Sequence, residues 1–156
     1  MINHELDETD RGILNLLQEN ARIFHKDIAV KLHKSVNAIY TRIRQLEAEG
    51  YIQKYTVIVD HKKIGRGLIA YTQVQVKPHT QECLNAFQKE VVKLPEVMEC
   101  SHMTGSFDFL LKIAIRDMDE YHKLLMNKLS KLQDVDNMQS FFVMAEAKRE
   151  TAYQLI

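Results

Sequence analysis

The stretch from Ser35 to Gly50, SVNAIYTRIRQLEAEG, constrains the fold of this chain more than any other part of its sequence. Its apolar residues recur three and four positions apart, which on a helix gathers them along one stripe; they are Val36, Ile39, Ile43 and Leu46. Ser35 is a good N-cap, because its hydroxyl accepts from an amide of the first turn. Gly50 suits the left-handed position after a helix. The sequence therefore predicts a bounded helix with one face against a core.

The opposite face of this helix carries polar side chains that suit a DNA groove. At 100° per residue, the outward positions are Asn37, Thr41, Arg44 and Ala48, with Ala38 and Gln45 beside them and Tyr40 and Arg42 on the flanks. Asn37 and Thr41 are candidates for base edges, because an Asn amide pairs with adenine and a Thr methyl contacts thymine. We expect Lys34, Ser35, Arg42 and Arg44 to hold phosphates or, for one arginine, a guanine, and Ala38 to lie in the same contact surface. The alternative is an ordinary solvated helix surface.

The residues before Ser35 strengthen the DNA-binding interpretation. Residues 26–32 repeat the apolar spacing, and only His33 and Lys34 separate them from the helix. Two short amphipathic helices joined so tightly predict a helix-turn-helix, whose second helix enters the major groove. From Arg22 to Gln45 there are six Lys or Arg residues and one acidic residue, although the whole chain has formal net charge +0. Because phosphates respond to the local patch, double-stranded DNA is the expected partner.

The chain is expected to begin with a helix capped by Asp7 and to continue past Gly50 as a strand. Residues 51–60 alternate and are rich in β-branched and aromatic residues, which predicts the wing of a winged helix-turn-helix domain. Residues 61–67 follow as a hinge with two glycines. The predicted domains are thus residues 1–60, the hinge, and residues 68–156.

The second domain is predicted to be α+β. Its pattern is strand 68–77, a helix capped by Thr80, strands 97–103 and 107–115, a helix capped by Asp117, and a last strand from about 135 to 147. This order is the ferredoxin-like βαββαβ arrangement, with both helices on one face of the sheet. The 107–115 strand is apolar on both faces, so the open face needs a second cover. A copy of the same chain is the expected cover, which predicts a homodimer.

Other classes of function find little support in the sequence. The chain has two cysteines, no run of about 18 apolar residues that would span a bilayer, and no leader-like start, so the cytoplasm is the expected compartment. Its seven histidines are dispersed, and Cys100 and His102 alone are too few for a metal site. No catalytic set of Ser, His and Asp or of Cys and His can be assembled. We expect no enzyme activity, no metal and no cofactor.

Four groups of residues spaced along the chain form a recognisable pattern. They are Leu6-Asp7-x-x-Asp10-Arg11-x-Ile13-Leu14, Arg42-Ile43-x-x-Leu46-Glu47-x-x-Gly50-x-Ile52, Ile64-Gly65, and Thr104-Gly105-x-x-Asp108 with Leu110-Leu111. In these residues the chain resembles the Lrp/AsnC (leucine-responsive and asparagine) transcription regulators, from near its start to about Lys148. The resemblance implies a DNA-binding winged helix joined to an amino-acid-sensing ferredoxin-like domain, with dimers that often assemble into octamers. It also implies that an effector binds between subunits near the Gly-x-x-Asp hairpin.

The predicted effector residues are Thr104, Gly105, Asp108 and Ser140. By turn chemistry alone, the first three favour a tight hairpin in which Gly supplies the turn and Asp bonds the loop backbone. The resemblance favours an amino-acid site instead, since a carboxylate accepts from an ammonium group and a glycine loop offers amides to a carboxylate. Two residues of the last strand depart from the family pattern: Met138 replaces a small hydroxyl residue and Gln139 a basic one.

Two alternative functions share this architecture. Sirohaem decarboxylases resemble the same two-domain plan, but such an enzyme has no use for a basic helix facing a groove. A sensor of amino acids that acts through partner proteins, without DNA, is the other alternative. The cationic excess from Arg22 to Gln45 favours the transcription regulator over the enzyme, and retention of genomic fragments by the purified protein distinguishes the regulator from the sensor.

Overall fold

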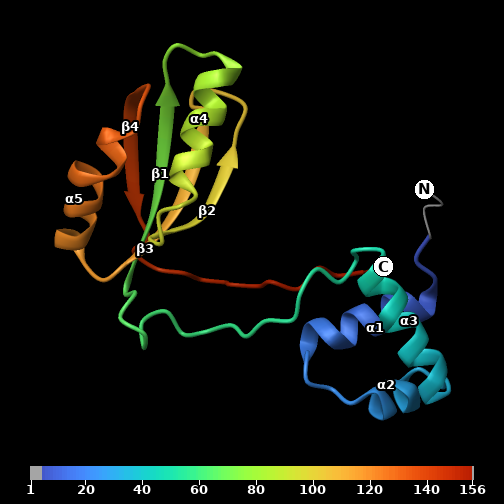
Figure 1. Cartoon of the computed structure of the whole chain (residues 1–156). Helices are drawn as coiled ribbons and strands as arrows, with labels where there is room; N and C mark the ends of the chain where they lie inside the picture. Colours follow the sequence, from blue (N-terminus) through green and yellow to red (C-terminus); the bar gives the residue numbers. More distant parts are fainter. Residues whose placement is uncertain (1–4, 156) are drawn as a thin grey trace. The chain divides into compact units, whose positions relative to one another are not determined.

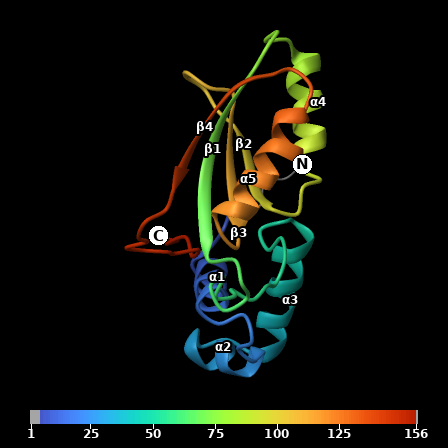
Figure 2. The same cartoon turned by 90° about the vertical axis from the view of Figure 1, so that its left-hand side faces the viewer.

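The chain divides into two units along its length. The computed structural model describes residues 5–155 (Figures 1 and 2). The first unit comprises the residues up to Ile58 together with the C-terminal segment from Lys148, and the second comprises Val59–Ala147. The chain therefore passes between the units twice, once in each direction. The sequence had placed the C-terminal segment with the second domain.

The first unit is built on three helices, α1 (Glu8–Glu19), α2 (His25–Lys31) and α3 (Val36–Ala48). Asp7 caps α1 in a capping box: its Oδ1 accepts from the Asp10 N–H at 2.8 Å, and its own N–H donates to Asp10 Oδ2 at 3.2 Å. Ser35 Oγ accepts from the Ala38 N–H at 3.2 Å, and Gly50 follows α3 with φ +80°. The predicted caps and the predicted end of α3 are confirmed.

The three helices enclose one apolar core. Its buried members are Ile13, Leu14, Ile28, Ala29, Ile39, Ile43 and Leu46. Val36, which was predicted to belong to the buried stripe, is instead 48% exposed. At 100° per residue, Val36 is rotated by about 50° from the mean direction of the other three stripe residues of α3. It also begins the helix, so its side chain lies at the edge of the packed face.

The predicted strand over residues 51–60 is wrong for the single chain, which forms no strand in that range. A strand requires a hydrogen-bonding neighbour, and no described segment pairs with these residues as a strand. Val57 and Ile58 are 77% and 67% exposed. Closer to α3, Tyr55 donates its hydroxyl to Glu47 Oε1 at 3.0 Å, which fastens the start of the segment to the helix.

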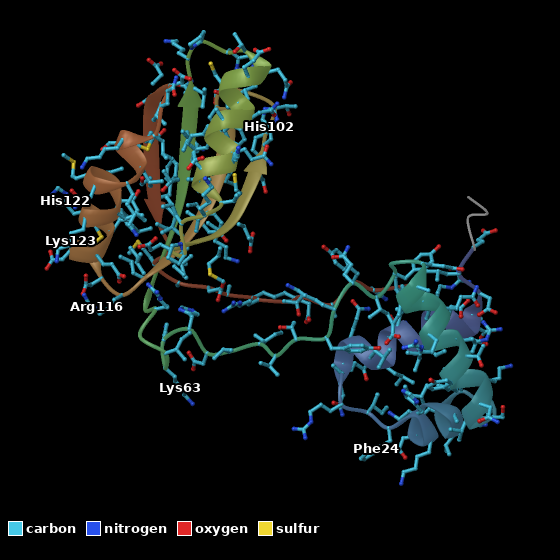
Figure 3. All side chains as sticks on the ribbon, viewed as in Figure 1. Phe24, Lys63, His102, Arg116, His122 and Lys123 are labelled. Atoms are coloured by element: carbon cyan, nitrogen blue, oxygen red, sulfur yellow. The ribbon has the colours of Figure 1, made fainter. Side chains whose placement is uncertain are left out.

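The predicted hinge is an ordered turn. Asp60 Oδ1 accepts from the Lys62 N–H at 3.0 Å, and the Arg66 N–H donates to the His61 carbonyl at 2.8 Å. The Arg66 guanidinium then donates to Glu120 Oε1 at 3.1 Å. Lys63 lies at the outside of the turn and is exposed (Figure 3). Since Arg66 and Glu120 belong to the second unit, this turn is attached to it by side chains as well as by the backbone.

The second unit is a four-stranded antiparallel sheet with two helices. Its elements are β1 (Leu68–Val76), α4 (Gln81–Val91), β2 (Val97–His102), β3 (Phe109–Ile115), α5 (Met118–Asn127), a 3₁₀ turn (Leu129–Lys131) and β4 (Val135–Phe142). The strand order β2-β3-β1-β4 confirms the ferredoxin-like prediction. Thr80 caps α4 and Asp117 caps α5, as predicted. β4 ends at Phe142 rather than Ala147, and β3 begins at Phe109 rather than Phe107.

Both helices cover the same face of the sheet (Figure 2). The core on that face is formed by alternate strand residues and by the apolar stripes of the helices; its fully buried members include Ala70, Val74, Phe87, Phe109, Leu111, Ile113 and Leu129. The opposite face carries Tyr71, which lies across from Lys112 on β3 and Phe141 on β4. Phe141 is 47% exposed, so this face presents aromatic surface that no described helix covers.

Candidate nucleic-acid interface and effector site

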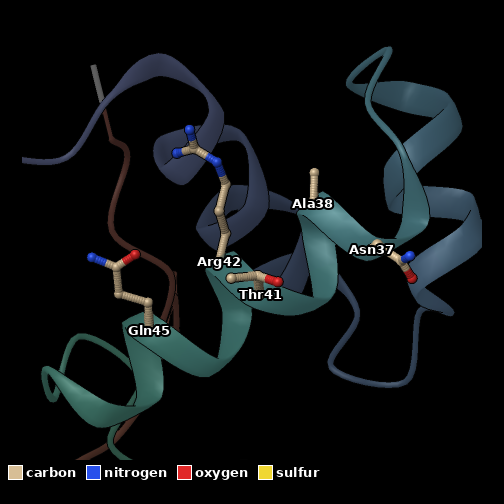
Figure 4. Close-up of a pocket in the computed structure, with 5 residues that line it drawn as sticks. All are labelled: Asn37, Ala38, Thr41, Arg42 and Gln45. Carbon is tan, nitrogen blue, oxygen red and sulfur yellow. The ribbon is translucent and has the colours of Figure 1, made fainter.

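The predicted recognition face of α3 is accessible. Asn37 and Thr41 are exposed, and together with Ala38, Arg42 and Gln45 they line a shallow open hollow (Figure 4). Ile39, Ile43 and Leu46, on the other side of the helix, are buried at 0–3% exposure. The apolar side of α3 thus holds the helix to the core, and its polar side remains available to a ligand.

Arg42 differs from the other residues of this face, because its charge is already paired. One guanidinium nitrogen, Nη1, lies 2.6 Å from Asp7 Oδ2 and 2.8 Å from Asp10 Oδ1. Asp10 is 1% exposed, so Arg42 compensates a buried carboxylate. The two carboxylates raise the pKa of Arg42, and the Asp10 N–H and then Arg42 lower the pKa of Asp7. Arg42 therefore joins α3 to the start of α1. The sequence analysis predicts a DNA contact for this residue and not this ion pair.

Arg44 is placed differently from Arg42. Its side chain is 68% exposed, and its nearest acid is Glu47 Oε2 at 3.6 Å, one turn along the same helix. An exposed pair at that distance restrains the side chain weakly. Lys34 and Ser35 lie exposed at the start of α3, in a turn closed by the Lys34 N–H on the Ala29 carbonyl at 2.9 Å. These residues are free to meet phosphates without breaking a buried contact.

In the second unit, the predicted effector residues Thr104, Gly105 and Asp108 lie together between β2 and β3. Gly105 has φ +118°, a conformation that a glycine adopts without strain. Asp108 Oδ2 accepts from the Val76 N–H at 2.7 Å, and Oδ1 lies 3.0 Å from Nδ1 of His79. The Asp108 side chain is 14% exposed. Asp108 thus anchors the hairpin to the end of β1 with one oxygen and faces His79 with the other.

Ser140 does not join this group. Its hydroxyl lies 3.2 Å from the Thr72 hydroxyl and is hydrogen-bonded to the Tyr121 hydroxyl, which is 3.0 Å from Thr72. Thr72 is fully buried, so the three hydroxyls form a closed network beneath α5. The structure therefore separates Ser140 from the hairpin residues with which the sequence had grouped it.

Sequence reasoning missed the partners of Asp108. The ferredoxin-like order pairs β1 with β3 in antiparallel fashion, which brings the end of β1 beside the start of β3. The predicted topology thus already contained the signal that Val76 lies near Asp108. His79 follows only three residues after Val76, where β1 ends, and the same reasoning would have found it.

The described residues show neither a metal-binding cluster nor a membrane-spanning helix. In the part of the chain that the structure describes, no three His, Cys, Asp or Glu side chains converge in a way that would hold a metal ion. Within residues 5–155, no helix combines the length and the apolar character needed to cross a membrane.

Comparisons with known proteins agree with the two units. Residues 6–53 match the winged helix-turn-helix DNA-binding family, and residues 69–153 match the Lrp/AsnC ligand binding domain. The chain is therefore a DNA-binding transcription regulator with an effector-binding domain. Because the ligand-binding match spans more than half of the chain, the chain belongs to the Lrp/AsnC family.

Individual relatives support the same class. The transcriptional regulator AzlB of Bacillus subtilis is 35% identical over 144 residues, which is 92% of each chain. The leucine-responsive regulatory protein of Escherichia coli is 33% identical over 93% of this chain and 88% of its own. A transcriptional regulator of Neisseria meningitidis, solved in complex with L-Met, superposes with a TM-score of 0.91 at 30% identity over 96% of both chains. These relatives are named as regulators, in agreement with the predicted absence of enzyme activity, and none supports the sirohaem decarboxylase alternative.

Proposed function

We propose that this regulator reads DNA with the outward face of α3, Asn37 and Thr41 contacting base edges and Lys34, Ser35 and Arg44 contacting phosphates. The observation that supports this is the division of α3 into a buried apolar side and an exposed polar side. A helix held in this way presents side chains of the length and chemistry that the major groove accepts. Ala38 lies between the two base-reading candidates, where its small side chain permits close approach.

In this proposal Arg42 acts indirectly. Its guanidinium is bound to Asp7 and Asp10, so a phosphate contact would compete with an ion pair to a buried carboxylate. Arg42 sets the position of α3 against α1, while Arg44 meets the DNA.

The DNA contacts are tested with fragments recovered by incubating the purified protein with sheared genomic DNA. Arg44→Ala should weaken binding and reduce the slope of log K against log salt by about 0.9, which corresponds to one phosphate contact. Asn37→Ala should instead change which fragments bind and leave the slope unchanged. Gln88→Ala, an exposed polar substitution on α4 in the second unit, is the control and should alter neither. An unchanged slope for Arg44→Ala would remove it from the phosphate contacts.

We further propose that an α-amino acid binds at the hairpin of Thr104, Gly105 and Asp108. The Asp108 side chain is 14% exposed and its carboxylate suits an ammonium group, and the exposed glycine turn offers backbone amides to a carboxylate. The L-Met complex of the Neisseria relative supports an amino acid as the chemical class. Ser140, held under α5, would act on such a site only through the sheet.

L-Methionine and L-leucine are the probes for this site. Isothermal titration of the full chain should show binding of one of them, and Asp108→Ala should abolish the heat and the effect of that amino acid on DNA affinity. Because Asp108 also anchors the hairpin, Gln75→Ala provides the control: it removes the bond from Gln75 Nε2 to the Ser106 carbonyl at 2.5 Å and keeps the carboxylate. Binding that survives Asp108→Ala would exclude this residue from the site.

The assembly follows from the open sheet face. Tyr71 and Phe141 lie on the face opposite the helices, where a second copy would cover them. We propose a homodimer through this face, and assembly of four dimers into an octamer. Phe141→Glu should shift the mass measured by light scattering to that of a smaller species, and an unchanged mass would exclude this face. We also propose the cytoplasm as the compartment of this DNA-binding protein.

A further inference from the structure

The C-terminal end of the chain returns to the first unit and docks on α1. After Val143, whose N–H donates to the Ile69 carbonyl at 2.9 Å, residues 144–151 are all exposed and belong to no helix or strand. Tyr153 and Leu155 then contact α1, and Leu155 packs against the core of the three helices. Figure 1 shows this segment in red, leaving β4 and ending at the helical unit.

The contact has the chemistry of peptide recognition. The side-chain amide of Gln18 pairs with both backbone groups of Tyr153: Nε2 donates to the carbonyl at 2.9 Å, and Oε1 accepts from the N–H at 2.7 Å. Asn15, three residues earlier and so on the same face of α1, donates to the Leu155 carbonyl at 3.4 Å. Backbone recognition of this kind fixes the register of the segment, and Leu155 supplies the apolar anchor.

The docked segment is linked to the recognition helix through α1. The far end of α1 carries Asp7 and Asp10, which hold Arg42 of α3. The last strand of the effector-binding unit is therefore connected to α3 by a covalent segment, a docked end and an ion pair. Without the docked end, the first unit would be attached to the second by residues near 59 alone.

We propose that this surface of α1 is the docking site for the chain's own C-terminal end, and that Gln18 is a positioning residue for DNA binding. The residues near 59 and the docked segment together limit the rotation of the first unit relative to the second more than the residues near 59 alone would. A restrained unit loses less orientational freedom when it binds DNA, so release of the segment should weaken the affinity. The phosphate contacts themselves would be unchanged, so the salt dependence should stay the same.

The test uses the full chain and the matched pair Gln18→Ala and Glu19→Ala, neighbouring exposed positions of α1. Hydrogen exchange should show the Tyr153 amide protected in the wild type and exchanging at least tenfold faster in Gln18→Ala, with no change in Glu19→Ala. Far-UV circular dichroism verifies that both variants fold. A Tyr153 amide that exchanges equally fast in the wild type and in Gln18→Ala would overturn the docking.

The restraint is measured by time-resolved fluorescence anisotropy of a dye on α2, attached at Lys31→Cys with Cys83 and Cys100 replaced by serine. Gln18→Ala should add a nanosecond component of motion and weaken binding to the recovered genomic fragments about threefold or more, without changing the salt slope. A released segment with unchanged anisotropy and affinity would overturn the positioning role. If the wild type retains no fragment, the DNA contacts proposed above fail, while exchange and anisotropy still decide the docking and the restraint.

A disulfide experiment tests whether the C-terminal segment docks on α1 of its own chain or of a second copy. In the background without Cys83 and Cys100, Gln18→Cys with Tyr153→Cys should oxidise to a species of monomer mass on non-reducing gels. A species of dimer mass would show that the end docks on a second copy, and would overturn docking within one chain.

Discussion

The ion pair between Arg42 and the start of α1 gives the sharpest quantitative prediction. Arg42→Met largely keeps the aliphatic part of the side chain. It removes the cation that pairs with Asp10, whose side chain is 2% exposed. Removing one partner of a buried pair costs about 3–5 kcal/mol. Here the cost is lower, because the Arg42 side chain is 33% exposed and Asp10 Oδ2 still accepts from the Asp7 N–H at 3.2 Å. We expect a loss of about 2–3 kcal/mol.

The assay is native-state hydrogen exchange of the amides in α1 and α3, which reports the free energy of opening of the first unit without a signal from the second. A loss of about 2–3 kcal/mol corresponds to exchange roughly 30- to 150-fold faster. Arg44→Met is the matched control, since it removes the same cation from the same helix at an exposed position, and it should cost about 0.5 kcal/mol or less. If the two variants accelerate exchange equally, Arg42 does not support α1 and the reasoning fails.

Three further outcomes follow from single contacts. The Asp10 N–H and Arg42 lower the pKa of Asp7. The contribution of Asp7 to stability is therefore present above about pH 4 and lost as the pH falls. Urea titrations below about pH 4 should show that the free energy of unfolding depends less on pH in Asp7→Asn than in the wild type. Burial and the bond to Glu47 raise the pKa of Tyr55 to about 12. The stabilisation from Tyr55 should therefore be complete below about pH 10 and disappear as the pH rises through 12, and nuclear magnetic resonance of its ring carbon in wild type and Glu47→Gln measures the shift. Gly105→Ala should cost about 1 kcal/mol or more by thermal unfolding, because φ at this position is +118°.

Local chemistry was sufficient to predict most of the helices and strands. The caps at Asp7, Ser35, Thr80 and Asp117 all form, since each depends on a hydroxyl or carboxylate and an amide two or three residues away. The strand order was predictable because the ferredoxin-like pattern admits few topologies. By contrast, β4 was predicted too long, because no glycine or proline in residues 143–147 marks its end, whereas only Val143 continues the hydrogen bonding, to Ile69.

Contacts between distant parts of the chain that the predicted topology does not imply could not be predicted in this way. The strand predicted over residues 51–60 depends on a neighbouring strand, and none of the described residues supplies one. The docked C-terminal end joins Gln18 to Tyr153 across 135 positions, and neither residue type marks such a contact in the sequence. The effector residues illustrate both cases: the hairpin of Gly105 and Asp108 is local, whereas Ser140 is placed by the Thr72 and Tyr121 hydroxyls on other elements.

The two arginines of α3 show why a functional surface is harder to predict than the helix that carries it. Helical periodicity puts Arg42 on a flank and Arg44 on the outward face, but side chains of this length reach either a neighbouring helix or a solvent-side ligand. What separates them is a pair of carboxylates 32 and 35 residues away, which bind the first and leave the second free. Those carboxylates also form the capping box of α1, so the contacts that shape the first helix decide which cation remains available to DNA.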